Sequence, residues 1–261
     1  MPYICQDYLP ISPWTTKATR RLPGVQPIRG ESCFLVDEVF HRQMAYREKL
    51  LKTRRDKVYF NNLETSLACQ ELLDFVIEEV KKNDQYSFKK EKIVRPDSTE
   101  VDLRSDDPLE VAASLVQEDL LLLNEENCEH LLRAGVLCFP ASWTLAEKKN
   151  KSLTNIHGPV KEYGTELASR VEKIFNNLKP ETPVWRANFL LYDDHELFQP
   201  RLESQEKGNI RKTISQFMRV ERQTLKKLPV SKTILFSIHT FVIPYDNLSS
   251  HQKETLISFL V

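Results

Sequence analysis

The sequence predicts an α+β fold, a five-stranded antiparallel sheet with helices over one face that follows an N-terminal helical extension. Two apolar runs of strand length, Leu115–Leu123 and Leu131–Phe139, flank the polar segment Asn124–Asn127, which we expect to form a turn. Helical periodicity follows in Thr165–Leu178. Further strand candidates come after it. This order of strand and helix candidates fits one antiparallel sheet with helices over one face.

The first 110 residues are expected to form an arm and a helical extension. Five prolines indicate an extended arm over residues 1–35, wrapped on the surface. Apolar residues at helical spacing predict helices over Val36–Leu51 and Ala68–Val80. Residues 83–108 are polar and charged without a sustained period, which indicates an irregular connection.

The second half of the chain supplies the remaining strands. We predict strands at Val184–Leu191, Phe217–Leu228 and Thr233–Ile243, with Pro229–Lys232 closing a hairpin. Phe217–Leu228 also fits a helix, and its polar alternation favours the strand. A short C-terminal helix follows, where Ser249 and Gln252 are typical of a capping box.

The predicted order along the chain is two strands, short helices, a longer helix and then three strands. This order is PAS-like, and it leaves a pocket between the sheet and the helix that follows His157. The expected division is an arm and helical extension (1–110), a PAS-like core (111–248) and a C-terminal helix (249–261).

Composition narrows the classes of function. The 37 basic and 37 acidic residues cancel, so no net field favours nucleic acid or an anionic membrane. The N-terminus lacks the pattern of a secretory signal, and no apolar run approaches a membrane span. Five cysteines at scattered spacing indicate reduced thiols. We therefore expect a cytoplasmic protein.

His157 is the best candidate for a positioned imidazole. It lies between Ile156 and the Gly158–Pro159 pair, and Pro159 is expected to stiffen the peptide that follows the histidine. Spacing alone leaves open whether the imidazole is a ligand or a structural loop histidine.

The segment RVERQTLKKLP, Arg219–Pro229, is chemically unusual for a strand. Arg219, Glu221 and Gln223 would share one face, and Val220, Arg222 and Thr224 the other. Charges on an inner strand are costly to bury unless they are paired or used. The alternative is an edge strand whose charges are solvated or paired.

Several segments together resemble one family. QEDLLLL (117–123), LCFPASW (137–143), IHGPV (156–160), WRANF (185–189) and RVERQTLKKLP are similar, in order and spacing, to haem-dependent oxidative N-demethylase alpha subunits. The resemblance covers most of the chain, and RVERQTL is its most specific part. It implies a PAS-like fold that binds haem b, activates dioxygen and removes a methyl group from a small alkylamine. It also implies electrons from separate NADPH-dependent reductase subunits carrying flavin and an iron–sulfur cluster.

The resemblance also assigns candidate roles. His157 becomes the expected iron ligand, with His239 as its rival. Arg219 and Arg222 are candidates to polarise dioxygen or hold a haem propionate, and Arg186 is a further propionate candidate. Glu221 would pair with these arginines or balance a protonated amine, with Asp119 as the next acid in line.

Two other functions stay open on sequence grounds. A PAS-like haem protein could be a sensor or carrier without turnover, and a scaffold that lost its cofactor could act through protein contacts alone.

Overall fold

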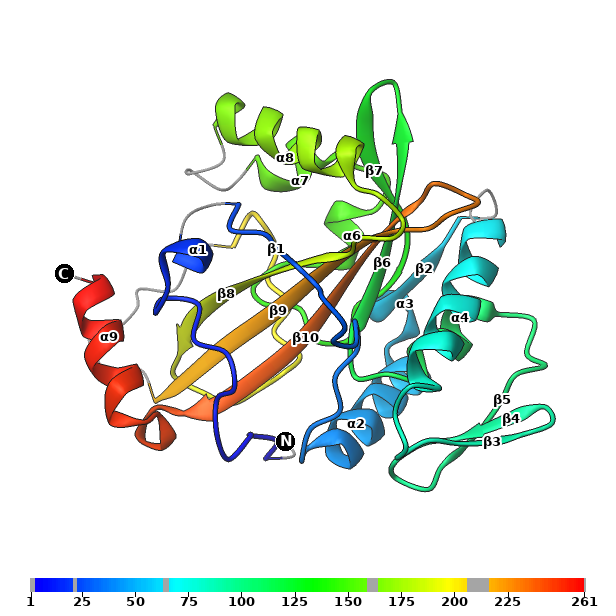
Figure 1. Ribbon diagram of the computed structural model, residues 1–261, viewed down its shortest axis with the longest axis horizontal. Helices are drawn as coiled ribbons and strands as arrows, with labels where there is room; N and C mark the ends of the chain where they lie inside the picture. The colour runs from blue at the N-terminus through cyan, green and yellow to red at the C-terminus, as the bar shows by residue number, and fades with distance from the viewer. Residues whose placement is uncertain (1–2, 21–22, 63–65, 159–163, 206–215, 261) are drawn as a thin grey trace.

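The computed structural model describes residues 3–20, 23–62, 66–158, 164–205 and 216–260 (Figure 1). In chain order its elements are α1 (Lys17–Arg20), β1 (Gln26–Pro27), α2 (Phe40–Thr53), α3 (Arg55–Val58), β2 (Tyr59–Asn61), α4 (Ser66–Val80), β3 (Ser87–Lys89), β4 (Lys92–Val94), β5 (Glu100–Asp102), α5 (Pro108–Ala113), β6 (Asp119–Glu126), β7 (Glu129–Val136), α6 (Leu145–Lys148), α7 (Leu153–His157), α8 (Thr165–Asn177), β8 (Val184–Tyr192), β9 (Phe217–Lys227), β10 (Ile234–Pro244), the 3-10 helix η2 (Tyr245–Asn247) and α9 (Ser250–Leu260). The predicted α+β class is confirmed.

The main sheet has seven antiparallel strands rather than five, in the order β1-β8-β9-β10-β6-β7-β2. The predicted strands form its centre as β6 to β10. The two additional strands come from the N-terminal part, where β1 pairs with β8 and β2 pairs with β7. Strands of two and three residues have too little alternation to be recognised in a sequence.

The β9–β10 hairpin is the longest pairing in the sheet. It runs in register from Phe217↔Pro244 to Lys227↔Ile234, which confirms the strand interpretation over the helical one. The Leu228 N–H donates to the Thr233 carbonyl at 2.9 Å and closes the predicted turn. Because β9 lies between β8 and β10, its charged residues are on an inner strand.

The β6–β7 hairpin differs from the prediction at its ends. Strand β6 begins at Asp119, where it starts to pair with Ile238 of β10. The side chains of the preceding Gln117 and Glu118 accept the backbone N–H groups of Asp37 and Leu35. The turn falls at Asn127 and Cys128, whose φ angles are 51° and 65°. Positive φ at both central residues suits a two-residue hairpin turn, so the preceding polar residues stay in the ladder.

Two expectations for the N-terminal half are wrong in part. The supposed irregular connection over residues 83–108 contains the three-stranded sheet β3-β4-β5, whose pair Ile93↔Val101 is buried. The arm is not confined to the surface either, since Trp14 is 0% exposed and its Nε1–H donates to the Gln252 carbonyl at 3.1 Å. Apolar side chains on an extended arm can be buried as completely as those of a helix.

The strands divide the core into two sides. The helix face of the sheet carries Leu225 and Ile238, which pack with residues of α6, α7 and α8. The arm face carries Val220 and Phe241, which pack with Trp14 and with residues of α9. Figure 1 shows the N-terminal arm running across β8, β9 and β10.

The C-terminal helix α9 begins with the predicted capping box. The Ser249 N–H donates to the Gln252 side chain at 2.9 Å, and the Gln252 N–H donates to Ser249 Oγ at 3.2 Å. Within the described residues, no helix combines the length and the apolar character needed to cross a bilayer.

Replacing Val220 by proline should unfold the protein, because an inner strand would lose a ladder N–H and gain a fixed φ. Circular dichroism and chemical denaturation would measure the loss of folded protein. Val220→Ala is the matched control, since it keeps the N–H and should cost on the order of 2 kcal/mol. A folded Val220→Pro protein with wild-type stability would contradict the inner-strand assignment.

Candidate functional site

Helix α7 is fastened to the sheet at its first residue and near its last. Ser152 forms a bridge to Leu131 of β7, and its side chain caps the helix by accepting the Asn155 N–H. At the other end, the buried Lys148 donates to the Ile156 carbonyl at 2.6 Å and to Glu203 at 2.5 Å. These contacts fix the backbone next to the half-buried His157.

The protonation and orientation of His157 follow from its own helix. Its Nδ1–H donates to the Leu153 carbonyl at 2.9 Å, so Nε2 carries the ring's lone pair. Burial lowers the pKa of His157, and the nearby charges of Lys148 and Arg186 lower it further against the effect of this hydrogen bond. The imidazole is therefore neutral at pH 7, the form that can ligate a metal. Pro159, expected to stiffen this turn, lies outside the described residues.

A polar row crosses the helix face of the sheet beside these helices. The register places Arg186 opposite Gln223, and Asn188, Glu221 and Thr240 side by side on β8, β9 and β10. Gln223 donates to Glu221 Oε2 at 3.1 Å, and Asn188 does so at 3.4 Å. Arg186 Nη1 donates to Gln223 at 3.1 Å. The Glu221 carboxylate is thus buried with two neutral amides as donors.

Several polar atoms on this face have no hydrogen-bond partner in the described residues. They are Arg186 Nε, Asn188 Oδ1, Arg219 Nε and Thr240 Oγ1, all on the three adjacent strands β8, β9 and β10. Buried polar groups in folded proteins are almost always paired, and each exception needs an explanation. Four exceptions on one face of three strands indicate a place where a ligand meets the protein.

Arg219 lies next to the polar row, two residues before Glu221 on the same face of β9. It is 1% exposed, and it donates to the Phe139 carbonyl and, at 3.0 Å, to the Leu197 carbonyl. Its Nη2 lies 3.4 Å from Glu221 Oε1, a long contact. The guanidinium therefore binds mainly backbone, and it leaves Glu221 incompletely neutralised.

Asp119, the next acid in line on sequence grounds, is already in use. Its oxygens accept the N–H groups of Cys138 and Phe139 at 2.8 and 2.9 Å, and Arg47 lies 3.0 Å away. Asp119 and Arg47 are both 0% exposed. The carboxylate holds the chain where it leaves β7, which makes Glu221 the better acceptor for a ligand.

The structure places Arg222 on the arm face, away from Glu221 and Arg219. Its Nη1 donates to the Cys33 carbonyl at 3.1 Å, and its guanidinium lies 5.7 Å from the centre of the Trp185 ring. Arg222 therefore fastens the arm to the sheet. The geometry does not bring it to the polar row, and its suggested role at a cofactor is not carried further.

His239, the rival ligand, is also on the arm face and has both ring nitrogens engaged. Nδ1 lies 2.9 Å from Glu118 and Nε2 lies 3.2 Å from Asp37. Burial alone would lower the pKa of His239, but the two carboxylates outweigh it and raise the pKa to about 9. A doubly bonded imidazolium cannot ligate a metal, so the geometry favours His157.

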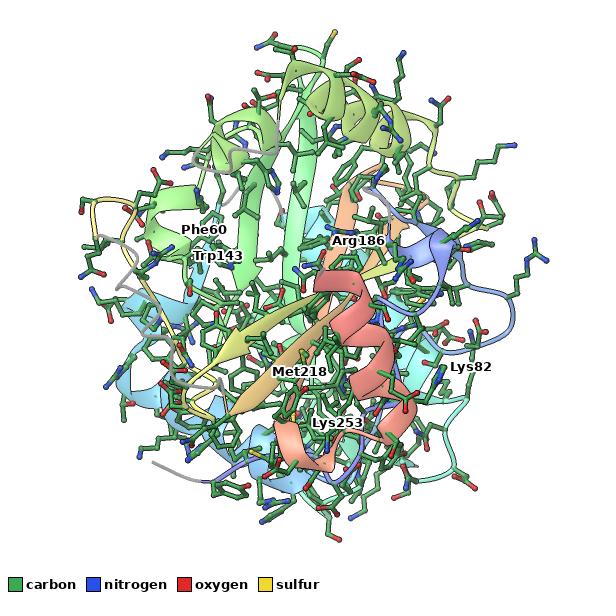
Figure 2. The ribbon with its side chains drawn as sticks, turned by 90° about the vertical axis from the view of Figure 1, so that its left-hand side faces the viewer. Phe60, Lys82, Trp143, Arg186, Met218 and Lys253 are labelled. Carbon is green, nitrogen blue, oxygen red and sulfur yellow. The ribbon has the colours of Figure 1, made fainter. Side chains whose placement is uncertain are left out.

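Apolar side chains border the polar row. The apolar side of α8, with Val171 and Ile174, packs only in part against the helix-face core and remains partly exposed. Trp143 and Phe60 border the same core (Figure 2). A partly covered apolar surface lies on the same side of the sheet as the polar atoms that lack partners in the described residues, a combination that suits a mostly apolar ligand.

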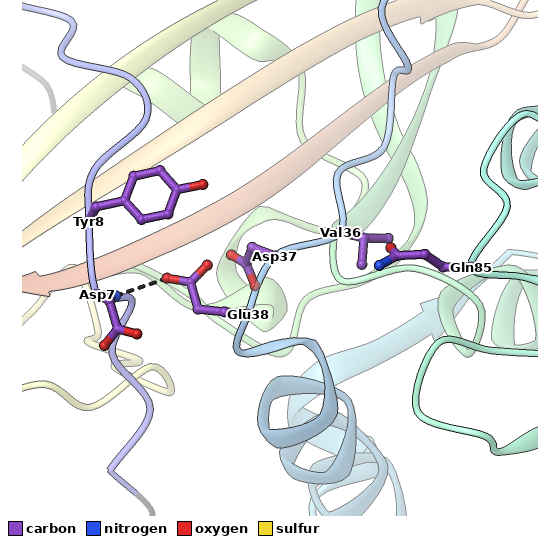
Figure 3. Close-up of a pocket in the computed structure, with 6 residues that line it drawn as sticks. All are labelled: Asp7, Tyr8, Val36, Asp37, Glu38 and Gln85. Atoms are coloured by element: carbon purple, nitrogen blue, oxygen red, sulfur yellow. Dashed lines mark hydrogen bonds between the residues drawn. The ribbon is translucent and has the colours of Figure 1, made fainter.

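The described residues line a cavity of ≈ 150 Å³ at β8 that adjoins the polar row. Its lining includes Arg186 and Asn188 together with aromatic residues of the arm and α9. A second cavity, of ≈ 380 Å³, lies between the arm and the start of α2, and its lining includes the carboxylates of Asp7, Asp37 and Glu38 (Figure 3). In the part of the chain that the structure describes, no three His, Cys, Asp or Glu residues converge to hold a metal ion.

Sequence reasoning missed three residues of this region. Asn188 and Thr240 have no charge and no motif of their own, and only the register shows that they flank Glu221. His130 has no motif of its own either, yet it is 2% exposed and its Nδ1 lies 2.7 Å from Glu172 of α8. This contact fastens α8 to β7.

The His239 network predicts a pH-dependent stability. Because the folded-state pKa is raised from 6.5 to about 9, the stabilisation is complete below pH 6.5 and is lost as the pH rises through about 9. The shift corresponds to about 3 kcal/mol of unfolding free energy. Urea denaturation across this range should show that loss in the wild type and not in His239→Gln. Parallel pH profiles for the two proteins would contradict a charged His239, and the exposed His251→Gln serves as control.

A comparison with protein families agrees with this geometry. A family model described as haem-dependent oxidative N-demethylase, alpha subunit-like, matches residues 24–260. The match includes both the His157 helix and the whole polar row of the sheet. The chain therefore belongs to the family of haem-dependent oxidative N-demethylase alpha subunit-like proteins.

Proposed function

We propose that this protein binds haem b and oxidatively removes a methyl group from a small alkylamine with dioxygen. The observation that carries the proposal is the group of partnerless buried polar atoms around Glu221, on the sheet face that also faces α7. The family membership supports the haem dependence and the type of reaction.

The residues present fit haem. His157 offers an imidazole whose pKa is lowered by burial, and its backbone is held by Lys148 and Ser152. Arg186 is a half-buried cation whose Nε is shielded from solvent and has no hydrogen-bond partner in the described residues, so it suits a propionate. The partly covered apolar side of α8 suits the porphyrin ring. We accordingly propose His157 as the iron ligand and Arg186 as a propionate partner.

A PAS-like core is part of the same proposal. Along the chain, β6 and β7 are followed by α6, α7 and α8, and then by β8, β9 and β10. In space the five strands have the order β8-β9-β10-β6-β7, with those helices over one face. This arrangement supports a ligand pocket between the sheet and the helices.

Glu221 is proposed to receive the amine. A small alkylamine is protonated at neutral pH, and its ammonium loses its water when it enters a buried site. Glu221 accepts from two neutral amides and has one long contact, at 3.4 Å, with Arg219, so its charge is available to balance an ammonium ion. Arg219 would hold the Glu221 carboxylate in place, and it is the candidate to polarise dioxygen.

The haem would supply dioxygen activation and oxidation of the N-methyl group. The electrons would come from NADPH through partner subunits that carry flavin and an iron–sulfur cluster, which agrees with the alpha-subunit description of the family. Turnover of an amine with such a reductase separates this function from that of a haem-binding sensor or carrier.

His157→Ala should lose haem or shift its absorption spectrum to a weakly ligated state, because the proposed iron ligand is removed. The absorption spectrum of purified protein checks this, with circular dichroism to show that the fold is kept. His41→Ala, on the exposed side of α2, is the matched control. Unchanged ferric and ferrous spectra in His157→Ala would exclude His157 as the ligand.

Glu221→Gln should weaken amine-induced spectral shifts about tenfold, equivalent to roughly 1.4 kcal/mol, because the shape is kept while the charge is removed. Haem content should stay at the wild-type value. If amine affinity survives and haem is lost instead, Glu221 serves the pairing with Arg219 and the proposed amine site is wrong.

A further inference from the structure

We propose that Asn188 and Thr240 act with Glu221 as a row of hydrogen-bond acceptors that distinguishes alkylammonium ions by their number of N–H bonds. This inference rests on the proposed function, since it assumes that the amine binds at Glu221. It assigns specificity to two uncharged residues on the strands that flank the carboxylate.

The register brings these residues together. Asn188 of β8 is directly opposite Glu221 of β9, and Thr240 of β10 is opposite Glu221 on the other side. All three point to the helix face, and directly opposite residues in antiparallel strands have Cβ atoms about 4.5–5.5 Å apart. Two hydrogen bonds of ordinary length from one tetrahedral nitrogen reach acceptors about 4.7 Å apart. Neighbouring side chains of the row therefore start close enough together for one ammonium nitrogen to donate to two of them.

The acceptors have capacity for these bonds. Asn188 turns its amide nitrogen to Glu221 Oε2 at 3.4 Å, so its Oδ1 points elsewhere and has no partner in the described residues. Thr240 Oγ1 is likewise buried without a partner there. Glu221 Oε1 receives only the long 3.4 Å contact from Arg219, whereas Oε2 receives two amide donors.

The number of N–H bonds decides how many acceptors are satisfied. A protonated dialkylamine has two N–H bonds, so it can bind Glu221 and one flanking acceptor. A protonated trialkylamine has one N–H, and a tetraalkylammonium ion has none. An acceptor left buried and unpaired weakens binding, because it has lost water without gaining a partner. The row therefore favours the ion with two N–H bonds, although all these ions have the same charge.

The test compares binding of dimethylammonium, trimethylammonium and tetramethylammonium to the haem-containing protein by isothermal titration calorimetry. Thr240→Val removes the hydroxyl at nearly constant volume, and Asn188→Leu removes the amide. Ser237→Ala is the matched control, because Ser237 Oγ is also buried without a partner on β10 but points to the arm face. Thr240→Ser keeps the hydroxyl and should behave like the wild type.

The wild type should bind dimethylammonium about tenfold more tightly than trimethylammonium. Thr240→Val and Asn188→Leu should each reduce this preference severalfold, mainly by weakening dimethylammonium, while Ser237→Ala keeps it. An unchanged preference in both variants would overturn the inference, as would an equal loss for all three ions. If Glu221→Gln leaves amine binding intact, the proposed amine site itself fails, a result that the flanking variants cannot produce.

Discussion

The buried carboxylate of Asp119 determines how the chain passes from the sheet to the helices. It accepts the N–H groups of Cys138 and Phe139 just after β7 ends, and Arg47 of α2 lies against it. Burial raises the pKa of Asp119 in opposition to the Arg47 charge, so the pairing is what makes the ion tolerable there. The Phe139 carbonyl is then fixed in place to receive Arg219. A carboxylate, two arginines and a turn thus form one unit.

The buried charged groups on the two faces of the sheet have different hydrogen-bond partners. On the arm face, His239 lies between Asp37 and Glu118, and amide side chains of Gln6 and Gln117 complete the bonding of Asp37. That network fastens the arm to β10 and leaves one oxygen, Glu118 Oε2, without a partner in the described residues. On the helix face, four polar atoms of three adjacent strands lack partners in the same part of the chain. The larger number of unpaired atoms makes the helix face the better candidate for a ligand site.

Helices α6, α7 and α8 cover the helix face and are held there by side-chain contacts. Lys148 of α6 binds both the carbonyl before His157 and Glu203, so α7 and the segment after β8 are held by one side chain. The contact of His130 with Glu172 fastens α8 to β7. Rigid placement of a histidine beside a partly covered apolar wall is what a positioned haem ligand requires.

The sequence by itself determined the elements with strong local signals. Alternation predicted the β9–β10 hairpin and the sharing of one face by Arg219, Glu221 and Gln223, because side chains of a strand point alternately to its two sides. The capping box at Ser249 and the family resemblance were also readable, since both depend on residues at fixed spacing. Together these signals were enough for the α+β class, and they made His157 the candidate ligand.

Only the tertiary structure decided which distant residues meet. Several contacts join segments that are far apart in the chain. They are the pairing of β1 with β8 and of β2 with β7, the burial of Trp14, and the hydrogen bonds of His239 with Asp37 and Glu118. Asn188 and Thr240 gained their significance in the same way, through strand register alone. Local pattern does not encode such contacts, because the free energy of burying a polar group depends on partners that the fold supplies.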